Sequence, residues 1–370
     1  MSRLACNETL MALADQLGTP SYVYDLAEID RKVAEFRQAI AVPTLVILFA
    51  TMANPTIEIL RHLASIGVGA CVNSLSHLRL AIAAGIPPAN IQFTASGLST
   101  DQMDALIDLK VGVNLDSLGQ LRLWIDRGGR CAGLRINAGS LVDKPGDRLG
   151  LDVHELMDAL DLARLAGCRI EGAHVYVGTN FQGPDAMFPT LRAFFQIATS
   201  IPDLTYVNVG GGIGVDYRRS GSGFDLGAYG AELKQLHKSL GRDLTLFFEP
   251  GRAMAASCGV FLSKVTDIKR LGGRTFVAVD GSVAQFPRPF HQPDSPHSVR
   301  PLSATTTEQM EMVVVGRTTF SRDILAECSL PTSVKVGTIL AFEDAGAYCS
   351  SMASRFLGQP EPAVHFLPAG

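Results

Sequence analysis

Lysine, and charge in general, is scarce in this chain of 370 residues. Only eight of its 32 basic residues are lysine, and charged residues make up 18% of the sequence, below the roughly 25% of an average globular domain. No block of lysine and arginine marks a surface for nucleic acid or for an anionic membrane, and the formal net charge is -4. These absences argue against a polybasic binding protein and favour a small-molecule ligand.

Long apolar runs and paired cysteines are missing as well. No run approaches the roughly 20 apolar residues needed to cross a bilayer, and the first residues lack the basic and apolar regions of a secretory signal. The seven cysteines are scattered, with no CxxC pair and no clustering with histidine of the zinc-site kind. We therefore expect a cytoplasmic protein with reduced thiols, no membrane span and no bound metal.

The chain does have an ample apolar fraction, 47%, and a regular alternation of strand and helix patterns. Short apolar or β-branched runs alternate with Ala- and Leu-rich stretches whose apolar residues recur at three- and four-residue spacing. Eight such units over about 210 residues favour a (β/α)8 barrel over an open doubly wound sheet. The predicted strands are Leu45–Ala50, Gly69–Asn73, Ile91–Ala95, Gly112–Leu115, Leu134–Ala138, Ile170–Val177, Tyr206–Val209 and Leu244–Phe248.

The alternation ends near Met254, where strand patterns continue without convincing helices. Ser21–Tyr24 is a candidate N-terminal strand that joins this later group. We therefore predict a barrel domain over residues 25–253 and a mostly β domain formed by residues 1–24 together with 254–370. The later predicted strands are Cys258–Val265, Arg274–Val279, Met310–Val315, Val334–Phe342 and Ala363–Leu367.

Two motifs stand where a barrel carries its functional residues, at the carboxyl ends of the strands. Gly210–Gly214 follows the penultimate predicted strand, and successive glycines leave backbone N–H groups open to a phosphate. Glu249-Pro250-Gly251-Arg252 follows the last strand. A flexible turn and a structural ion pair would also explain the two motifs separately. Together at one barrel mouth they favour a phosphorylated ligand.

With these motifs the sequence resembles the fold-type III pyridoxal 5′-phosphate (PLP) enzymes, specifically the ornithine/diaminopimelate/arginine decarboxylase family. The resemblance covers nearly the whole chain in ordered motifs. It implies an alanine-racemase-like (β/α)8 barrel with a C-terminal β domain, PLP as cofactor, and a homodimer with sites at the subunit interface. Further matching segments are residues 19–25, Tyr217, Asp280-Gly281, Arg288-Pro289, residues 346–348 and residues 351–354.

The resemblance implies a role for each matching residue. Glu249 would pair with the pyridine nitrogen and keep it protonated, so that the ring can accept electrons. Asp280 would lie near the entrance of the site, and Asp323 would come from the partner subunit. The residues that would hold the cofactor and its phosphate are Gly210, Gly211, Gly212, Gly251, Arg252 and Tyr348, with Arg135 and Thr179 completing the wall.

The chain departs from the family where the family bonds its cofactor. The family motif Y-A-x-K-A-N, whose lysine forms the internal Schiff base, reads F-A-T-M-A-N over residues 49–54, which puts Met52 at the lysine position. A thioether has no nucleophilic nitrogen and cannot bond the cofactor aldehyde. None of the eight lysines follows another predicted strand end directly, although Lys144, in the loop after Leu134–Ala138, is a candidate substitute.

Neighbouring positions of the expected pocket have changed as well. Two family acids, one on the strand Gly69–Asn73 and one a turn later, align with Cys71 and His77. In the motif H-x-H-x-G-S the first histidine is kept as His174, but the second, which stacks on the cofactor ring, is Tyr176. Replacements grouped in this way favour natural divergence of the site over a single inactivating exchange.

The C-terminal motif that supplies the family's general acid is also altered. The cysteine of this motif aligns with Thr319, and the acid that binds a substrate amine aligns with Phe320. A hydroxyl is a poor proton donor to a carbanion, and phenylalanine cannot bind a distal ammonium group. A substrate without that ammonium, with a carboxylate placed near Arg317, would suit this motif.

Three functions stay open at this point. The chain could bind PLP, or PLP already joined to an amino acid, non-covalently and act at the α-carbon of the amino acid by decarboxylation. It could instead be a catalytically inactive pseudoenzyme with a regulatory role. It could also be an enzyme with repurposed, PLP-independent chemistry, carried by Tyr176, His174, His77 and Cys71. Each of these four side chains also has a purely structural explanation.

Overall fold

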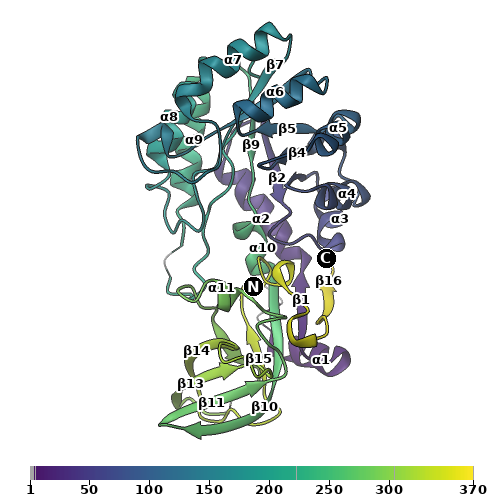
Figure 1. The fold of residues 1–370 in the computed structure, drawn as a ribbon. Helices are drawn as coiled ribbons and strands as arrows, with labels where there is room; N and C mark the ends of the chain where they lie inside the picture. Colours follow the sequence, from purple (N-terminus) through teal and green to yellow (C-terminus); the bar gives the residue numbers. More distant parts are fainter. Residues whose placement is uncertain (1–3, 5, 222, 304, 370) are drawn as a thin grey trace. The chain divides into compact units, whose positions relative to one another are not determined.

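The computed structural model describes residue 4 and residues 6–221, 223–303 and 305–369 (Figure 1). The chain divides into two compact units. One, here called the barrel unit, comprises residues 33–215 and 223–251. The other, here called the β unit, comprises residues 1–32, 216–222 and 252–370. No helix among the described residues is both long enough and apolar enough to cross a membrane.

The barrel unit contains a closed ring of eight strands. All neighbouring pairs are parallel, and the last strand closes against the first through the pairing of Ile47 with Phe248. The predicted (β/α)8 barrel is therefore confirmed, with the largest difference at β6, which begins at Cys131 rather than Leu134. The strands are β2 Leu45–Ala50, β3 Gly69–Val72, β4 Ile91–Thr94, β5 Gly112–Leu115, β6 Cys131–Ile136, β7 Arg169–Val175, β8 Tyr206–Asn208 and β9 Thr245–Phe248.

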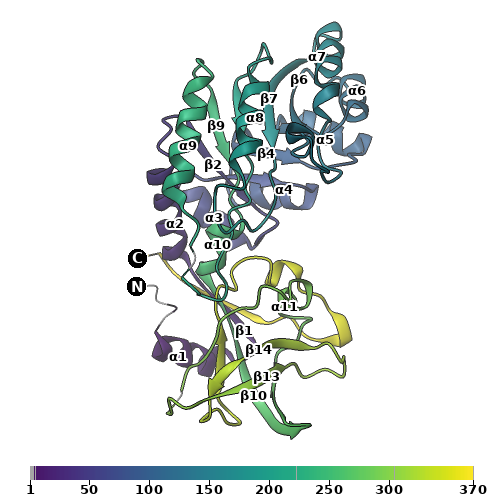
Figure 2. The same cartoon turned by 90° about the vertical axis from the view of Figure 1, so that its left-hand side faces the viewer.

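Helices lie outside this ring of strands (Figure 2). The α3 helix shows why: Ile59, Leu60 and Leu63 are its buried residues, at the spacing of one helix face. Several helices begin at a serine whose hydroxyl accepts a backbone N–H, as Ser74 does from His77. The helices are α2 Leu26–Ala39, α3 Ile57–Ser65, α4 Leu75–Ala83, α5 Thr100–Leu109, α6 Leu118–Asp126, α7 Leu156–Leu165, α8 Phe188–Ala198 and α9 Leu226–Ser239.

Part of the barrel interior is polar. Tyr206 Oη donates a hydrogen bond of 2.8 Å to Asn114 Oδ1, and Asn114 Nδ2 donates one of 2.9 Å to Thr94 Oγ1. The strands β6 and β7 make room for the Tyr206 ring with Gly133 and Gly172, since a Cβ atom at either glycine would collide with that tyrosine. These two glycines are therefore required by packing rather than by a turn.

Replacing Gly172 with alanine is expected to lower the free energy of unfolding by about 1–3 kcal/mol, because a closed barrel cannot move the Tyr206 ring aside. Urea unfolding followed by circular dichroism would measure the effect. The matched control is Gly183→Ala, where the added methyl group meets nothing within 4 Å and the expected change is below about 0.5 kcal/mol. Equal stability of the two variants would contradict this packing.

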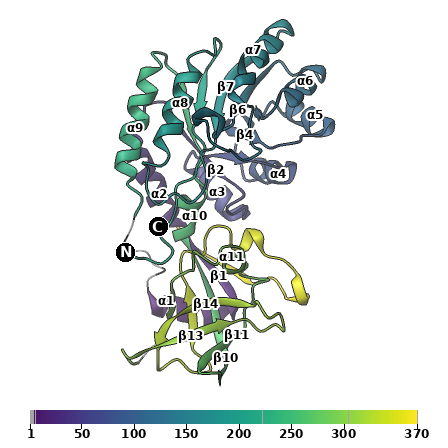
Figure 3. The same cartoon turned by 60° about the vertical axis from the view of Figure 1, so that its left-hand side comes forward.

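The β unit is built on an eight-stranded sheet (Figure 3). The strand order is β12-β15-β10-β11-β13-β14, and β1 adds to this path by pairing with β10 and with β16. The predicted N-terminal strand does join the C-terminal sheet, since β1 is antiparallel to β10 and parallel to β16. The strands are β1 Ser21–Asp25, β10 Gly259–Leu271, β11 Arg274–Val279, β12 Val299–Pro301, β13 Gln309–Val315, β14 Ile324–Pro331, β15 Ile339–Phe342 and β16 Ala363–Leu367.

One predicted strand of this unit is wrong in its first half. Residues 334–338 form a turn in which Val334 N–H donates to Pro331 O and Thr338 N–H donates to Lys335 O. Gly337, with φ of 91°, supplies the left-handed backbone that the turn needs. The strand β15 therefore begins at Ile339, while β14, which precedes the turn, was not predicted.

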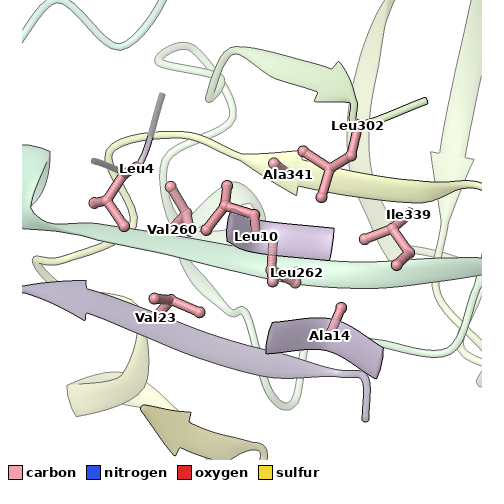
Figure 4. Packing of buried hydrophobic residues seen from close by; sticks show 9 residues of the cluster. All are labelled: Leu4, Leu10, Ala14, Val23, Val260, Leu262, Leu302, Ile339 and Ala341. Atoms are coloured by element: carbon pink, nitrogen blue, oxygen red, sulfur yellow. The ribbon is translucent and has the colours of Figure 1, made fainter. Parts of the chain in front are cut away.

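The helix α1 Asn7–Leu17 belongs to the core of the β unit (Figure 4). Its residues Leu10 and Ala14 are spaced by four, so they lie on one face of the helix and pack against the apolar side chains of the sheet. Two short helices, α10 Arg252–Ala255 and α11 Arg288–His291, complete this unit. The core cluster consists of Leu4, Leu10, Ala14, Val23, Val260, Leu262, Leu302, Ile339 and Ala341.

Candidate active site

Glu249 is the centre of a buried hydrogen-bonded cluster at the carboxyl end of the barrel. Its Oε1 accepts a hydrogen bond of 2.7 Å from Asn208 Nδ2, and its Oε2 lies 3.3 Å from His174 Nε2. The thiol of Cys71, on β3, also hydrogen-bonds this carboxylate. Burial by itself would raise the pKa of Glu249, but the nearby His174 and these hydrogen bonds lower it below the ordinary value of 4.5. Glu249 is therefore an anion at neutral pH.

Cys71 is a neutral thiol in this cluster rather than a nucleophile. Burial raises its pKa well above the ordinary value, and the negative charge of Glu249 raises it further. His174 turns Nε2–H toward Glu249, because a carboxylate can only accept. The other ring nitrogen of His174, Nδ1, is buried and has no hydrogen-bond partner among the described residues.

The glycine loop after β8 is held to Glu249 through the backbone of Glu249 and through Asn208. Gly210 N–H donates to Asn208 Oδ1 (2.9 Å), and Glu249 N–H donates to Gly210 O (2.8 Å). Gly210 and Gly212 have φ angles of 63° and 106°, which favour glycine. A Cβ atom at Gly211 would collide with the carbonyl oxygen of Glu249. The loop therefore needs all three glycines.

Two backbone N–H groups of this loop have no acceptor in the part of the chain that the structure describes. No acceptor among the described residues bonds Gly211 N–H or Gly212 N–H, whereas Gly210 N–H is already used by Asn208. Unpaired N–H groups in a largely buried loop are rare in folded proteins and are typical of an anion-binding loop. Of the three predicted glycines, Gly211 and Gly212 have backbone N–H groups not used by another described residue, whereas Gly210 N–H donates to Asn208.

Arg135 and Tyr176 form the next part of this barrel mouth. Arg135 pairs in register with His174 across β6 and β7. The guanidinium carbon of Arg135 lies 5.6 Å from the centre of the Tyr176 ring, which is cation–π contact distance. Its positive charge also opposes the rise in the pKa of Cys71. Thr179 follows Tyr176 on the same loop and is exposed.

The turn that carries Met52 lies beside the turn that carries Glu249. Ala50 N–H donates to Pro250 O, and Ala53 N–H donates to Ala50 O. A Cβ atom at Gly251 would lie 3.1 Å from the Cβ atoms of Ala50 and Ala53, so this glycine allows the close approach. His77, on α4, contacts the same turn through Thr51 at 3.0 Å. Lys144, by contrast, is exposed on the loop between β6 and α7.

The β unit contains a cluster of two arginines and two tyrosines. The guanidinium carbon of Arg252 lies 4.7 Å from the centre of the Tyr348 ring, and Arg252 Nη1 donates to Tyr217 Oη at 3.0 Å. The other face of the cluster is the fully buried Arg288, whose guanidinium carbon lies 3.4 Å from the centre of the Tyr217 ring. Among the described residues no carboxylate pairs with either arginine, and the Nε of each has no partner. Such a cluster is suited to an anion.

The other predicted substrate residues also lie in the β unit. Asp280 accepts hydrogen bonds from Thr19 Oγ1 (2.5 Å), Ser263 Oγ (2.7 Å) and Lys264 N–H (2.8 Å). The carboxylate of Asp323 accepts from Val283 N–H at 2.7 Å and from Thr318. Both carboxylates are thus hydrogen-bonded within the β unit.

Phe320 lines an aromatic cavity of the β unit. Its ring centre lies 5.7 Å from that of Phe290 and 5.5 Å from that of Phe356. The cavity has a volume of about 550 Å³. Thr319 and Arg317, in the same segment, are exposed.

The comparisons with known proteins decide the family. The sequence profile described as "Pyridoxal-dependent decarboxylase, pyridoxal binding domain" matches residues 26–256. The chain belongs to this family. It is 28% identical to the diaminopimelate decarboxylase of Zymomonas mobilis, over 95% of this chain and 88% of that protein, and 30% identical to that of Deinococcus radiodurans, over 96% and 91%.

Among solved structures, the diaminopimelate decarboxylase of Helicobacter pylori complexed with L-lysine is similar over the whole fold. The TM-score is 0.90 at 26% identity, over 98% of this chain and 94% of that one. A pyridoxal-dependent decarboxylase binds PLP, and the barrel unit fits this cofactor on two observations. Glu249 is an anion that can face a protonated pyridine nitrogen, and the N–H groups of Gly211 and Gly212 can bind phosphate oxygens.

Sequence reasoning did not select Asn208 or Thr51, which the structure places at this site of the decarboxylase fold. Asn208 bridges Glu249 and Gly210, and Thr51 bridges Cys71 and His77. The signal for Asn208 is its position two residues after Tyr206 on one strand, which puts both side chains on the inward face. Thr51 stands at the variable position of the motif over residues 49–54, so the motif gave it no role, and its partners come from other elements.

The stability of the fold is expected to depend on Glu249 in a pH-dependent way. In Glu249→Gln the new amide N–H group would face another donor, Asn208 or His174. We therefore expect the free energy of unfolding to fall by about 1–3 kcal/mol at pH 7. The pKa of Glu249 is lowered in the folded state, so its contribution is complete above the ordinary value of 4.5 and is lost as the pH falls through the lower folded value. Urea unfolding of both proteins between pH 7 and pH 3 tests this. A difference that grows on acidification would contradict it.

Proposed function

We propose that this chain binds PLP at the carboxyl end of its barrel without a covalent bond to the protein, and that it decarboxylates an amino acid bound with the cofactor. One observation carries the proposal: the buried anion Glu249 belongs to a turn that the glycine loop contacts, and among the described residues the N–H groups of Gly211 and Gly212 have no partner. The residue aligned with the family lysine is Met52, which has no nitrogen with which to bond an aldehyde.

The residues of the barrel mouth would bind and orient the cofactor. Glu249 would accept a hydrogen bond from the protonated pyridine nitrogen. Asn208 and His174 would hold the carboxylate in place. Gly211 and Gly212 would donate to phosphate oxygens. Tyr176, backed by Arg135, would take the position of the family's stacking histidine. When bound, PLP supplies an electron sink for the bond that breaks at the α-carbon.

The β unit supports a restriction on the substrate. Phe320 lies among aromatic rings and has no carboxylate that could pair with a distal ammonium group. We therefore propose an amino acid without such a group, with a carboxylate that Arg317 can meet. Arg252, whose Nε has no partner, is proposed as an anion ligand together with Tyr348. We also propose a cytoplasmic homodimer, as the family implies.

Release of carbon dioxide tests the proposed activity. The purified chain would be incubated with PLP and a panel of amino acids, with Glu249→Gln and a sample without PLP run in parallel. We expect release that requires PLP and falls about 10²-fold in Glu249→Gln, as for a lost electrostatic contact in a catalytic site. Release that is equal without PLP would favour the third function, PLP-independent chemistry.

A pseudoenzyme is the second candidate, favoured by the exchanges at Met52 and Thr319. It predicts that the chain binds PLP but releases no carbon dioxide from any amino acid of the panel. Turnover that survives repurification of the protein, and that depends on Glu249, would exclude it.

A further inference from the structure

The hydroxyl of Thr51 contacts both the carbonyl oxygen of Cys71 and a ring nitrogen of His77. Thr51 Oγ1 lies 3.1 Å from the carbonyl oxygen of Cys71 and 3.0 Å from His77 Nδ1. Cys71 O also accepts the backbone N–H of Thr51 at 3.0 Å. A carbonyl oxygen can only accept, so a hydrogen bond from Thr51 Oγ1 to Cys71 uses the single hydroxyl proton of Thr51. Both contacts are hydrogen bonds only if His77 Nδ1 carries a proton and donates it to Thr51 Oγ1.

This tautomer leaves a lone pair on the other ring nitrogen of His77. A neutral imidazole protonated at Nδ1 is a base at Nε2, and among the described residues Nε2 has no hydrogen-bond partner. Burial lowers the pKa of His77 below its ordinary value of 6.5. The positive end of α4, in whose first turn His77 lies, acts in the same direction.

His77 also lies in the right part of the fold for chemistry. Thr51 follows the last residue of β2, so its contact brings His77 to the carboxyl end of the barrel, where Glu249 lies on the neighbouring turn. Met52, next in the chain, has no group that can take a proton. A site that binds an amino acid and has no lysine still needs a base, because an ammonium group cannot attack an aldehyde.

We propose that His77 is the general base of this site and that Thr51 is its positioning residue, an inference that rests on the proposed function. His77 Nε2 takes a proton from the ammonium group of the amino-acid ligand. The N–H bond of the ligand breaks, its electron pair stays on the ligand nitrogen, and a new N–H bond forms at Nε2. The products are a neutral amine and an imidazolium ion, so charge and protons balance.

The tautomer can be tested on the full chain without cofactor. Nitrogen-15 NMR of histidine-labelled protein would identify which ring nitrogen of His77 is protonated, with the signal assigned by its absence in His77→Asn. We expect the Nδ1–H form in the wild type and in Thr51→Ser, which keeps the hydroxyl, and loss of this preference in Thr51→Val. The Nε2–H form in the wild type would overturn the proposal.

The base role can be tested separately with PLP as the probe. In His77→Asn the amide N–H can still donate to Thr51, but no base nitrogen remains. We expect the affinity for PLP to be unchanged. When an amino acid is added to the PLP-loaded chain, the absorbance should change about 10²-fold more slowly than in the wild type. Equal rates in wild type and His77→Asn would overturn the base role alone. A wild-type chain that binds no PLP would instead overturn the proposed function, and the base role with it.

Discussion

Replacing Met52 with lysine is expected to give a chain that forms a covalent bond to PLP, whereas the wild-type chain forms none. Lysine is close to methionine in length and ends in an amine, the group that condenses with an aldehyde. The Met52 turn packs against Gly251, two residues after Glu249, so the new amine would start beside the proposed pyridine partner. Intact mass after PLP binding and borohydride reduction should show about one added group per variant chain.

Two controls separate this effect from unspecific reaction of surface lysines. Met52→Leu replaces the same side chain without supplying an amine and should behave as the wild type. Lys144→Ala, made in the Met52→Lys chain, should leave the added mass unchanged. A wild-type chain that itself gains one group, and loses it in Lys144→Ala, would show that Lys144 substitutes for the family lysine and would contradict the proposal.

Replacing Glu249 with glutamine is expected to weaken PLP binding by about 10- to 100-fold. A hydrogen bond to a charged group is worth about 1.5–3 kcal/mol, and about 1.4 kcal/mol corresponds to a tenfold change in affinity. The variant loses the anion and turns an amide N–H toward Asn208 or His174. Titration with PLP followed by absorbance, at a pH where circular dichroism shows the variant folded, measures the loss.

The matched control for this loss is Glu171→Gln. Glu171 lies near the start of β7, away from the carboxyl ends of the barrel strands, and it is part of the same fold. Its replacement removes one negative charge and should leave the affinity for PLP within about twofold of the wild type, since Glu171 is half-buried beside Arg169 and salt screens charges that solvent reaches. Equal losses in both variants would point to net charge rather than to the Glu249 contact.

The barrel could be predicted from the sequence because each strand is a short apolar run closed by turn residues. Gly112–Leu115 was predicted with its observed bounds for this reason. In the β unit the same rule placed the start of one strand at Val334, because apolar residues continue through the turn at Gly337. At residues 334–338 the pattern of apolar residues does not distinguish a strand from a turn. The positive φ of Gly337 does.

The site was predictable only where a motif marked it. Glu249 and the glycines stand in recognisable short motifs, so the sequence indicated both. The partners that keep Glu249 ionised, Asn208 and His174, lie 41 and 75 residues away in the chain, and only the closed barrel brings them to it. The proton position proposed for His77 rests on a hydroxyl that follows β2 and a carbonyl of β3, two segments that only the fold brings together.

The most direct test of the account is the amount of PLP that the wild-type chain holds, and how it holds it. Equilibrium dialysis against PLP should show saturable binding of about one PLP per chain, as expected for one barrel mouth. Denaturation after borohydride reduction should then release all of that PLP, since Met52 cannot bond it. Absence of saturable binding, or PLP that stays on the denatured chain, would contradict the account.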